Sequence, residues 1–221
     1  MKLLAIETAT EACSSALLIN GEISSLYQIA PRQHAALILS MVDELLSSAG
    51  VQLKDMDALA YGRGPGAFTG VRIATGVIQG LAFGAGLPVI PVSTLAALAQ
   101  GAASGQSNII SAIDARMGEV YWCLFEVGSS GLVSPVSEEK VSRPEKVQVK
   151  NNTPYFGVGT GWASYYSVLE KLPGIELTGF DGDRYPDARN IITLAQQEYQ
   201  KGNLVAAADA LPIYVRNKVT G

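Results

Sequence analysis

Histidine, cysteine and clustered metal ligands are scarce in this chain of 221 residues. The only histidine is His34, and the two cysteines, Cys13 and Cys123, lie far apart in strand-like apolar runs. A metal site needs several ligand side chains, and a serine triad needs a histidine base. Buried, widely separated cysteines are typical of a reducing compartment. We therefore expect no metal centre, no disulfide and no catalytic residue.

Basic charge is also in deficit, because 16 Lys and Arg residues face 20 Asp and Glu residues. The deficit holds in both halves of the chain, with 5 basic and 7 acidic residues up to Ser104, and 11 and 13 after it. A protein that binds nucleic acid by itself normally presents a basic surface to the phosphates. We therefore expect any contact with nucleic acid to be indirect.

Long apolar runs are absent as well. No segment approaches the roughly 20 apolar residues of a membrane span, and the run at residues 3–6 is too short for the core of a signal peptide. Hydrophobic residues still make up 48% of the chain, which is ample for a core. The sequence predicts a globular cytoplasmic protein without membrane contact.

The most distinctive stretch that is present covers residues 61–86 and reads YGRGPGAFTGVRIATGVIQGLAFGAG. It predicts a strand end, a glycine turn and a helix that Thr69 is placed to cap. Val71, Ala74 and Ile78 define a face that is expected to be buried. Gly76 and Gly80, four residues apart, lie on the opposite face. Each glycine costs roughly 1 kcal/mol of helix propensity but allows a neighbouring backbone to approach closely. That neighbour is either another helix of this chain or another protein.

The order of elements in the first half indicates the fold. Strands are predicted at residues 2–6, 14–19 and 22–29, with a hairpin turn at Asn20 and Gly21. Alternating helices and strands follow, including a helix at 31–48 and a helix capped by Ser93. Three antiparallel strands followed by alternating elements are typical of a ribonuclease H-type α/β lobe with a mixed sheet, the unit of the actin, sugar-kinase and Hsp70 superfamily.

A second, smaller lobe is predicted after residues 101–108 (GAASGQSN), which are rich in small and polar side chains. We expect a first lobe at residues 1–104 and a second at 105–221, with roughly the last ten residues packing back on the first lobe. Ser142 and Glu145 form a candidate capping box for a short helix, and Pro186 is expected to open a long one.

Four stretches together resemble the TsaB (YeaZ) family, bacterial proteins required to make threonylcarbamoyladenosine in tRNA. They are GRGPGAFTGVRIATGVIQGLA at 62–82, IETAT at 6–10, DARMGEVY at 114–121 and LPIYVRN at 211–217. The resemblance covers essentially the whole chain. It implies a non-catalytic subunit that forms a heterodimer with the paralogue TsaD and works with the ATPase TsaE. Together they would support threonylcarbamoyl transfer to N6 of the adenosine next to the anticodon.

The resemblance also implies where the partners meet and what they bind. TsaB-like chains join TsaD through two long helices of the first lobe, and can form a homodimer when the partner is absent. ATP and a metal would belong to the partner subunits, and tRNA would be contacted only through them. The expected partner-binding residues are His34, Leu37, Met41, Leu45, Thr69, Ile73, Gly76, Gly80 and Phe83.

Two enzymatic alternatives were weighed against this interpretation. A free-standing superfamily ATPase or kinase would use the turn after the first strand for phosphate, but residues 7–11 (ETATE) contain no glycine. A metal-dependent peptidase is the weakest alternative, because Thr94 and Leu98 stand where TsaD has its two metal-binding histidines. The only candidates for a nucleotide groove are Thr8, Asp114, Arg116 and Gly159, and for Arg116 a solvated surface role is the simpler interpretation.

Overall fold

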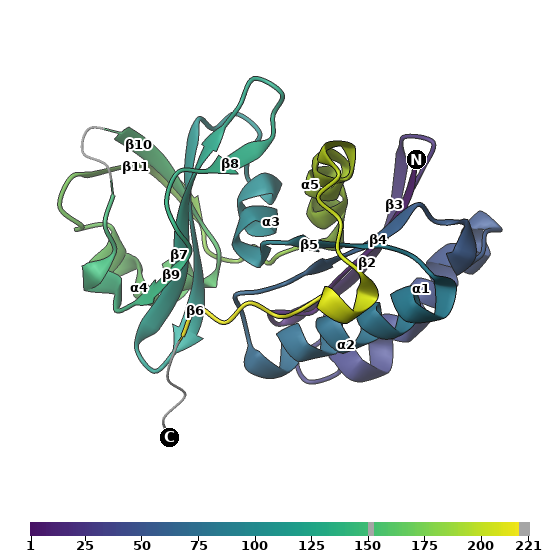
Figure 1. Cartoon of the computed structure of the whole chain (residues 1–221). Helices are drawn as coiled ribbons and strands as arrows, with labels where there is room; N and C mark the ends of the chain where they lie inside the picture. Colours follow the sequence, from purple (N-terminus) through teal and green to yellow (C-terminus); the bar gives the residue numbers. More distant parts are fainter. Residues whose placement is uncertain (150–152, 217–221) are drawn as a thin grey trace. The chain divides into compact units, whose positions relative to one another are not determined.

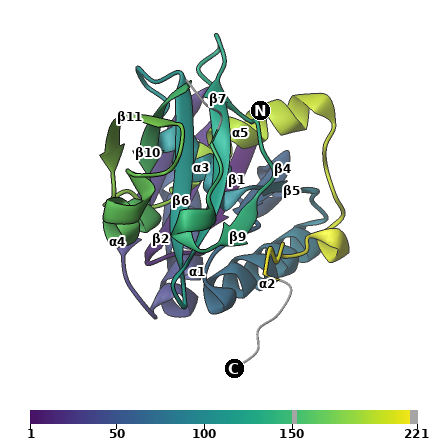
Figure 2. The same cartoon turned by 90° about the vertical axis from the view of Figure 1, so that its left-hand side faces the viewer.

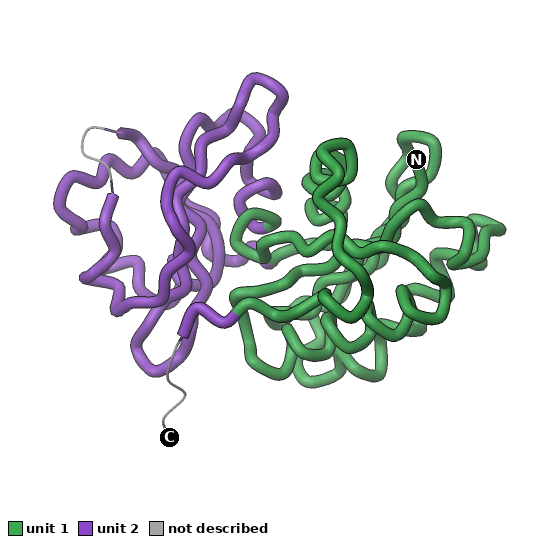
Figure 3. The backbone as a smooth tube through the Cα atoms, in the orientation of Figure 1, with its two compact units in different colours: residues 1–97, 186–213 green, residues 98–185, 214–221 purple. Residues whose placement is uncertain are grey.

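The computed structural model describes residues 1–149 and 153–216, which form two compact units (Figure 3). Unit 1 comprises residues 1–97 and 186–213, and unit 2 comprises residues 98–185 together with 214–216. Each unit has its own sheet and its own hydrophobic core.

The sheet of unit 1 has the strand order β3-β2-β1-β4-β5 (Figure 1). Its first three strands are antiparallel, while β4 and β5 run parallel to β1. Asn20 and Gly21 both have positive φ, and Ile19 pairs with Glu22, as in the tight hairpin that the Asn-Gly pair predicts. The strands are β1 (Lys2–Glu7), β2 (Ala12–Ile19), β3 (Glu22–Ile29), β4 (Ala58–Gly62) and β5 (Val89–Val92).

The sheet of unit 2 repeats this plan with the order β8-β7-β6-β10-β11, and β9 also pairs with β7 (Figure 2). Strands β6, β7 and β8 are antiparallel, whereas β10 and β11 run parallel to β6. The two-lobed, ribonuclease H-type fold class is therefore confirmed, without a repeat visible in the sequence. The strands are β6 (Asn108–Arg116), β7 (Glu119–Val127), β8 (Val133–Pro135), β9 (Lys140–Ser142), β10 (Thr153–Val158) and β11 (Ile175–Asp181).

Helices cover both faces of the first sheet (Figure 1). The helices α1 (His34–Ala49) and α2 (Phe68–Ala85) lie on one face, and α5 (Ala188–Lys201) lies on the other. The apolar stripes of α1 and α2 meet alternate residues of the strands, such as Leu4, Ile6 and Leu59, in one buried cluster. The remaining elements are α3 (Thr94–Gly101), α4 (Thr160–Leu169) and the short 3₁₀ turns η1 (Leu53–Asp55), η2 (Pro144–Lys146) and η3 (Ala207–Asp209).

The division between the units differs from the expected boundary at residues 104 and 105. The segment 186–213 belongs to unit 1, because the apolar side of α5 packs on the first sheet and Ala188 N donates to Ser14 Oγ at 3.0 Å. Of the last ten residues, which were expected to pack back on the first lobe, 212 and 213 belong to unit 1, where Ile213 N donates to the Arg63 carbonyl at 2.8 Å, whereas 214–216 belong to unit 2. Residues 217–221 lie outside the described residues.

Several local expectations also need correction. The helix expected from residue 31 begins at His34, because Arg32 takes a left-handed conformation with φ 67°. Thr69 does not cap α2, which begins at Phe68. Ser142 caps no helix either, because its hydroxyl accepts a hydrogen bond from the Trp122 indole. The strands β8, β9 and β11 were not expected from the sequence. Ser93 does cap α3, since its Oγ accepts from Ala96 N at 3.1 Å.

Candidate functional site

A row of exposed glycines lies along α2 in unit 1. Gly76, Gly80 and Gly84 are exposed, and a Cβ atom built on each would meet no other heavy atom within 4 Å. The opposite face of α2 is buried and includes Val71, Ala74 and Ile78. The alternative that the glycines pack against another helix of this chain is therefore excluded for the described residues. No packing contact among the described residues offsets the cost of these glycines in helix propensity.

The aromatic residue Phe83 lies beside this row and is 84% exposed, more than any other large hydrophobic side chain among the described residues. At the other end of the helix, Phe68 is half exposed and the Arg72 guanidinium lies 3.6 Å from the centre of its ring. We call the exposed side of α2 that carries Thr69, Gly76, Gly80, Phe83 and Gly84 the glycine face. Ile73 lies at its margin and is partly buried against the core.

The expected contribution of α1 to a partner surface needs correction. His34, Met41 and Leu45 are buried against the sheet, and Leu37 is partly buried. Their helical spacing marks the stripe that the unit uses for its own core, which leaves little of His34, Met41 and Leu45 accessible to a partner. The outward side of α1 instead exposes Leu39, which is 51% accessible. Its position off that stripe is the signal by which the sequence could have identified it.

The turn after β1 is closed by the start of α2. Thr8 is buried, and its hydroxyl donates to the Gly70 carbonyl at 2.7 Å. Ala67 N donates to the Ala9 carbonyl at 2.7 Å, and a Cβ on Gly70 would lie 2.1 Å from the Thr8 carbonyl oxygen. Thr8 is therefore committed to contacts within unit 1 and does not offer its hydroxyl to a nucleotide.

Glu7 supplies a hydrogen-bond acceptor from within the chain at this turn. Its fully buried carboxylate accepts hydrogen bonds from Ala9 N at 2.5 Å and from the Thr94 hydroxyl at 3.2 Å. Thr94 Oγ1 in turn accepts from Gly64 N at 3.2 Å. Burial raises the pKa of Glu7 to about 7, although the hydrogen bonds from Ala9 and Thr94 lower it in part. The amide of Ala9, which could otherwise approach a phosphate, is occupied.

In unit 2, Asp114 and Arg116 lie together at the turn between β6 and β7. The carboxylate of Asp114 accepts from Arg116 Nη1 at 3.1 Å, from the Tyr165 hydroxyl at 3.3 Å and from the Ser164 hydroxyl at 3.4 Å. Arg116 and Met117 both have positive φ, which is uncommon for residues with side chains. Asp114 is thus saturated by neighbours of its own unit, and this argues against a role as a general acid or base.

Gly159 precedes α4 and has a φ of 102°, a conformation that favours glycine. A Cβ at this position would lie 2.5 Å from the Ala112 carbonyl oxygen, so close packing also requires glycine. Its amide donates to the Asp181 carbonyl at 2.9 Å. Gly159 is therefore explained by packing and has no free amide for a phosphate.

His34 is buried at the first position of α1, and its Nε2 has no hydrogen-bond partner in the part of the chain that the structure describes. Among residues 1–149 and 153–216, no group of three or more His, Cys, Asp or Glu side chains is arranged to hold a metal ion. No helix within these ranges is long and apolar enough to cross a membrane.

Comparisons with known proteins agree on the kind of protein this chain resembles. A family model described as "TsaD: tRNA N6-adenosine threonylcarbamoyltransferase" matches residues 26–171. The tRNA threonylcarbamoyladenosine biosynthesis protein TsaB of Escherichia coli K12 is 44% identical over 99% of this chain and 96% of its own length. The TsaB protein of Haemophilus influenzae is 45% identical over 100% of this chain and 95% of its own length.

A solved structure gives the same result. YeaZ from Pseudomonas aeruginosa superimposes with a TM-score of 0.90 and is 46% identical to this chain in sequence. The match covers 96% of this chain and 99% of that one. The similarity therefore includes both units.

Proposed function

Since this chain belongs to the TsaB family, named for the biosynthesis of threonylcarbamoyladenosine in tRNA, we propose that it is the non-catalytic partner of a TsaD-like protein. The observation that carries the proposal is the glycine face of α2, where a Cβ atom added at Gly76, Gly80 or Gly84 would meet no described residue outside the helix backbone. A row of small residues at four-residue spacing suits the close approach of a second helix. The TsaD-like protein would supply that helix.

The catalytic steps and the use of ATP would belong to the TsaD-like and TsaE-like partner subunits. The amide of Ala9 is occupied by the Glu7 carboxylate, and that of Gly159 by the Asp181 carbonyl. These internal contacts support the proposal that this chain binds neither nucleotide nor metal by itself. ATP would be used by the partner subunits, including a TsaE-like ATPase, in the cytoplasm. The acidic composition supports a tRNA site on the TsaD-like protein and not on this chain.

Reconstitution tests the proposed role. Mixed with the TsaD-like protein of the same organism, the chain is expected to elute from a sizing column as a heterodimer. Formation of threonylcarbamoyladenosine by the purified enzymes should then require this chain. Separate elution together with full activity in its absence would contradict the proposal.

Calorimetry separates the partner role from that of a free-standing ATPase. On titration with ATP and magnesium, we expect the isolated chain to show no binding tighter than roughly 1 mM. The reason is that the amides of the two candidate phosphate turns are already paired within their own units. A TsaE-like ATPase is the positive control. Micromolar binding of ATP by this chain would favour the enzymatic alternative.

A further inference from the structure

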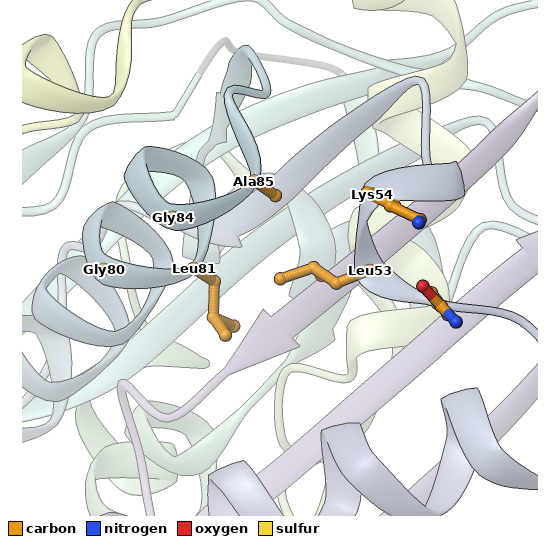
Figure 4. A pocket seen from close by; sticks show the side chains of 7 residues that line it. Leu53, Lys54, Gly80, Leu81, Gly84 and Ala85 are labelled. Carbon is orange, nitrogen blue, oxygen red and sulfur yellow. The ribbon is translucent and has the colours of Figure 1, made fainter.

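A notch of about 350 Å³ lies at the end of the glycine face (Figure 4). The second half of α2 forms one side of it with Gly80, Leu81 and Gly84, and the 3₁₀ turn η1 forms the other with Leu53. Figure 4 shows the Leu53 side chain extending across the gap toward α2, on which Leu81 lies. The volume falls at the lower end of the roughly 300–1,000 Å³ of ligand pockets. It is thus large enough for one bulky side chain.

The walls of the notch are held by the fold of unit 1. Leu53 and Leu81 are partly buried and pack against the hydrophobic core. The Asp55 carboxylate accepts from Gln52 N at 2.8 Å, which fixes the turn that carries Leu53. Gly80 and Gly84 contribute no side chains, so the notch remains open beside α2. It is a preformed apolar depression, which is the kind of site that receives an anchor residue in a protein interface.

The rim of the notch carries a positive charge. Lys54 is exposed and lines the notch next to Leu53. Its ammonium group forms no ion pair with any of the residues that the structure describes. A partner that places a carboxylate near Lys54 would therefore match the notch in charge as well as in shape.

We propose that the notch receives one large apolar side chain from a helix of the TsaD-like partner, with an acidic residue of that helix facing Lys54. The inference rests on the proposed function, because it assumes that the partner helix lies along the glycine face. A partner helix that follows Gly76 and Gly80 along α2 would meet the notch at Gly84, which lines it together with Leu53 and Leu81. A leucine, methionine or phenylalanine anchor meets both the apolar walls and the available volume.

Two substitutions test the notch independently of each other. Gly84→Leu fills it from α2, and Lys54→Glu reverses the charge of its rim without changing the helix. Binding to the purified TsaD-like protein is measured by biolayer interferometry at two salt concentrations. We expect Gly84→Leu to weaken binding about thirtyfold, as is typical of a blocked anchor site. We expect Lys54→Glu to weaken binding about fivefold at low salt and less at high salt, because salt screens the new repulsion. Lys146→Glu, on the exposed 3₁₀ turn of unit 2, is the matched control and should bind normally.

Gly76→Leu distinguishes failure of this inference from failure of the proposed function, because Gly76 belongs to the glycine face but does not line the notch. If Gly76→Leu abolishes binding while Gly84→Leu and Lys54→Glu bind within twofold of the unsubstituted chain, the notch is not an anchor site. If the two notch variants lose only self-association, as measured by sedimentation, the occupant is a second copy of this chain and the inference is overturned. Lys54→Glu keeps the test decisive should Gly84→Leu fail to fold.

Discussion

Replacing Gly80 with leucine is expected to abolish stable binding of the TsaD-like partner while leaving the chain folded. A Cβ on Gly80 meets no atom of the chain within 4 Å, so the added side chain projects outward from α2. Removal of a glycine from the helix interior should stabilise unit 1 by roughly 0.5–1 kcal/mol. A partner backbone packed against Gly80 would instead be displaced, and we expect about a hundredfold loss of affinity.

The two halves of this prediction are measured separately. Calorimetric melting of the isolated chain should show a Tm that is unchanged or raised by about 2–3 °C. Co-elution with the partner should be lost in the same preparation. Gln200→Leu, an exposed position on α5 of the same unit, controls for the addition of an apolar side chain to a helix surface and should still co-elute. Unfolding of the Gly80→Leu monomer would show that the position packs internally, and the intermolecular role of the glycine face would then be withdrawn.

Stability is expected to fall as the pH rises from about 4.5 to 7, because of Glu7. The pKa of this carboxyl is raised by burial from 4.5 to about 7 in the folded chain. Between these values the unfolded chain releases the proton while the folded chain keeps it, so unfolding becomes progressively easier. The full difference corresponds to about 3 kcal/mol, since each pKa unit is worth about 1.4 kcal/mol. The stabilising contribution is complete below pH 4.5 and is lost above pH 7.

Glu7→Gln isolates this effect from other titrating groups. Glutamine preserves the size of the side chain and an acceptor for Ala9 N, but it cannot ionise. The free energy of unfolding of Glu7→Gln, measured by urea denaturation, should rise by about 3 kcal/mol relative to that of the unsubstituted chain as the pH goes from 4.5 to 7.5. Glu44→Gln, at an exposed position on α1, should show no such change. Parallel pH profiles for Glu7→Gln and the unsubstituted chain would contradict the assigned titration.

Elements with strong local signals were predictable from the sequence. The Asn20-Gly21 turn requires positive φ at both residues and therefore predicted the first hairpin with its register. The row of Gly76 and Gly80 at a four-residue spacing identified an unusual helix face before the structure was known. Strand β11 gave no such signal, because its residues alternate between exposed and partly buried and Gly179 interrupts it.

The amino-acid sequence by itself determined the longer helices and the strands of the first sheet, and which face of α2 carries glycine, because these follow from side-chain spacing along the chain. Only the tertiary structure decided that α5 belongs to unit 1, that His34 and Met41 are buried, and that no described residue covers Gly80. It also brought Thr94 to the carboxylate of Glu7, 87 positions away in the sequence. Burial and protonation depend on such distant neighbours, since desolvation is a property of the packed core and not of local spacing.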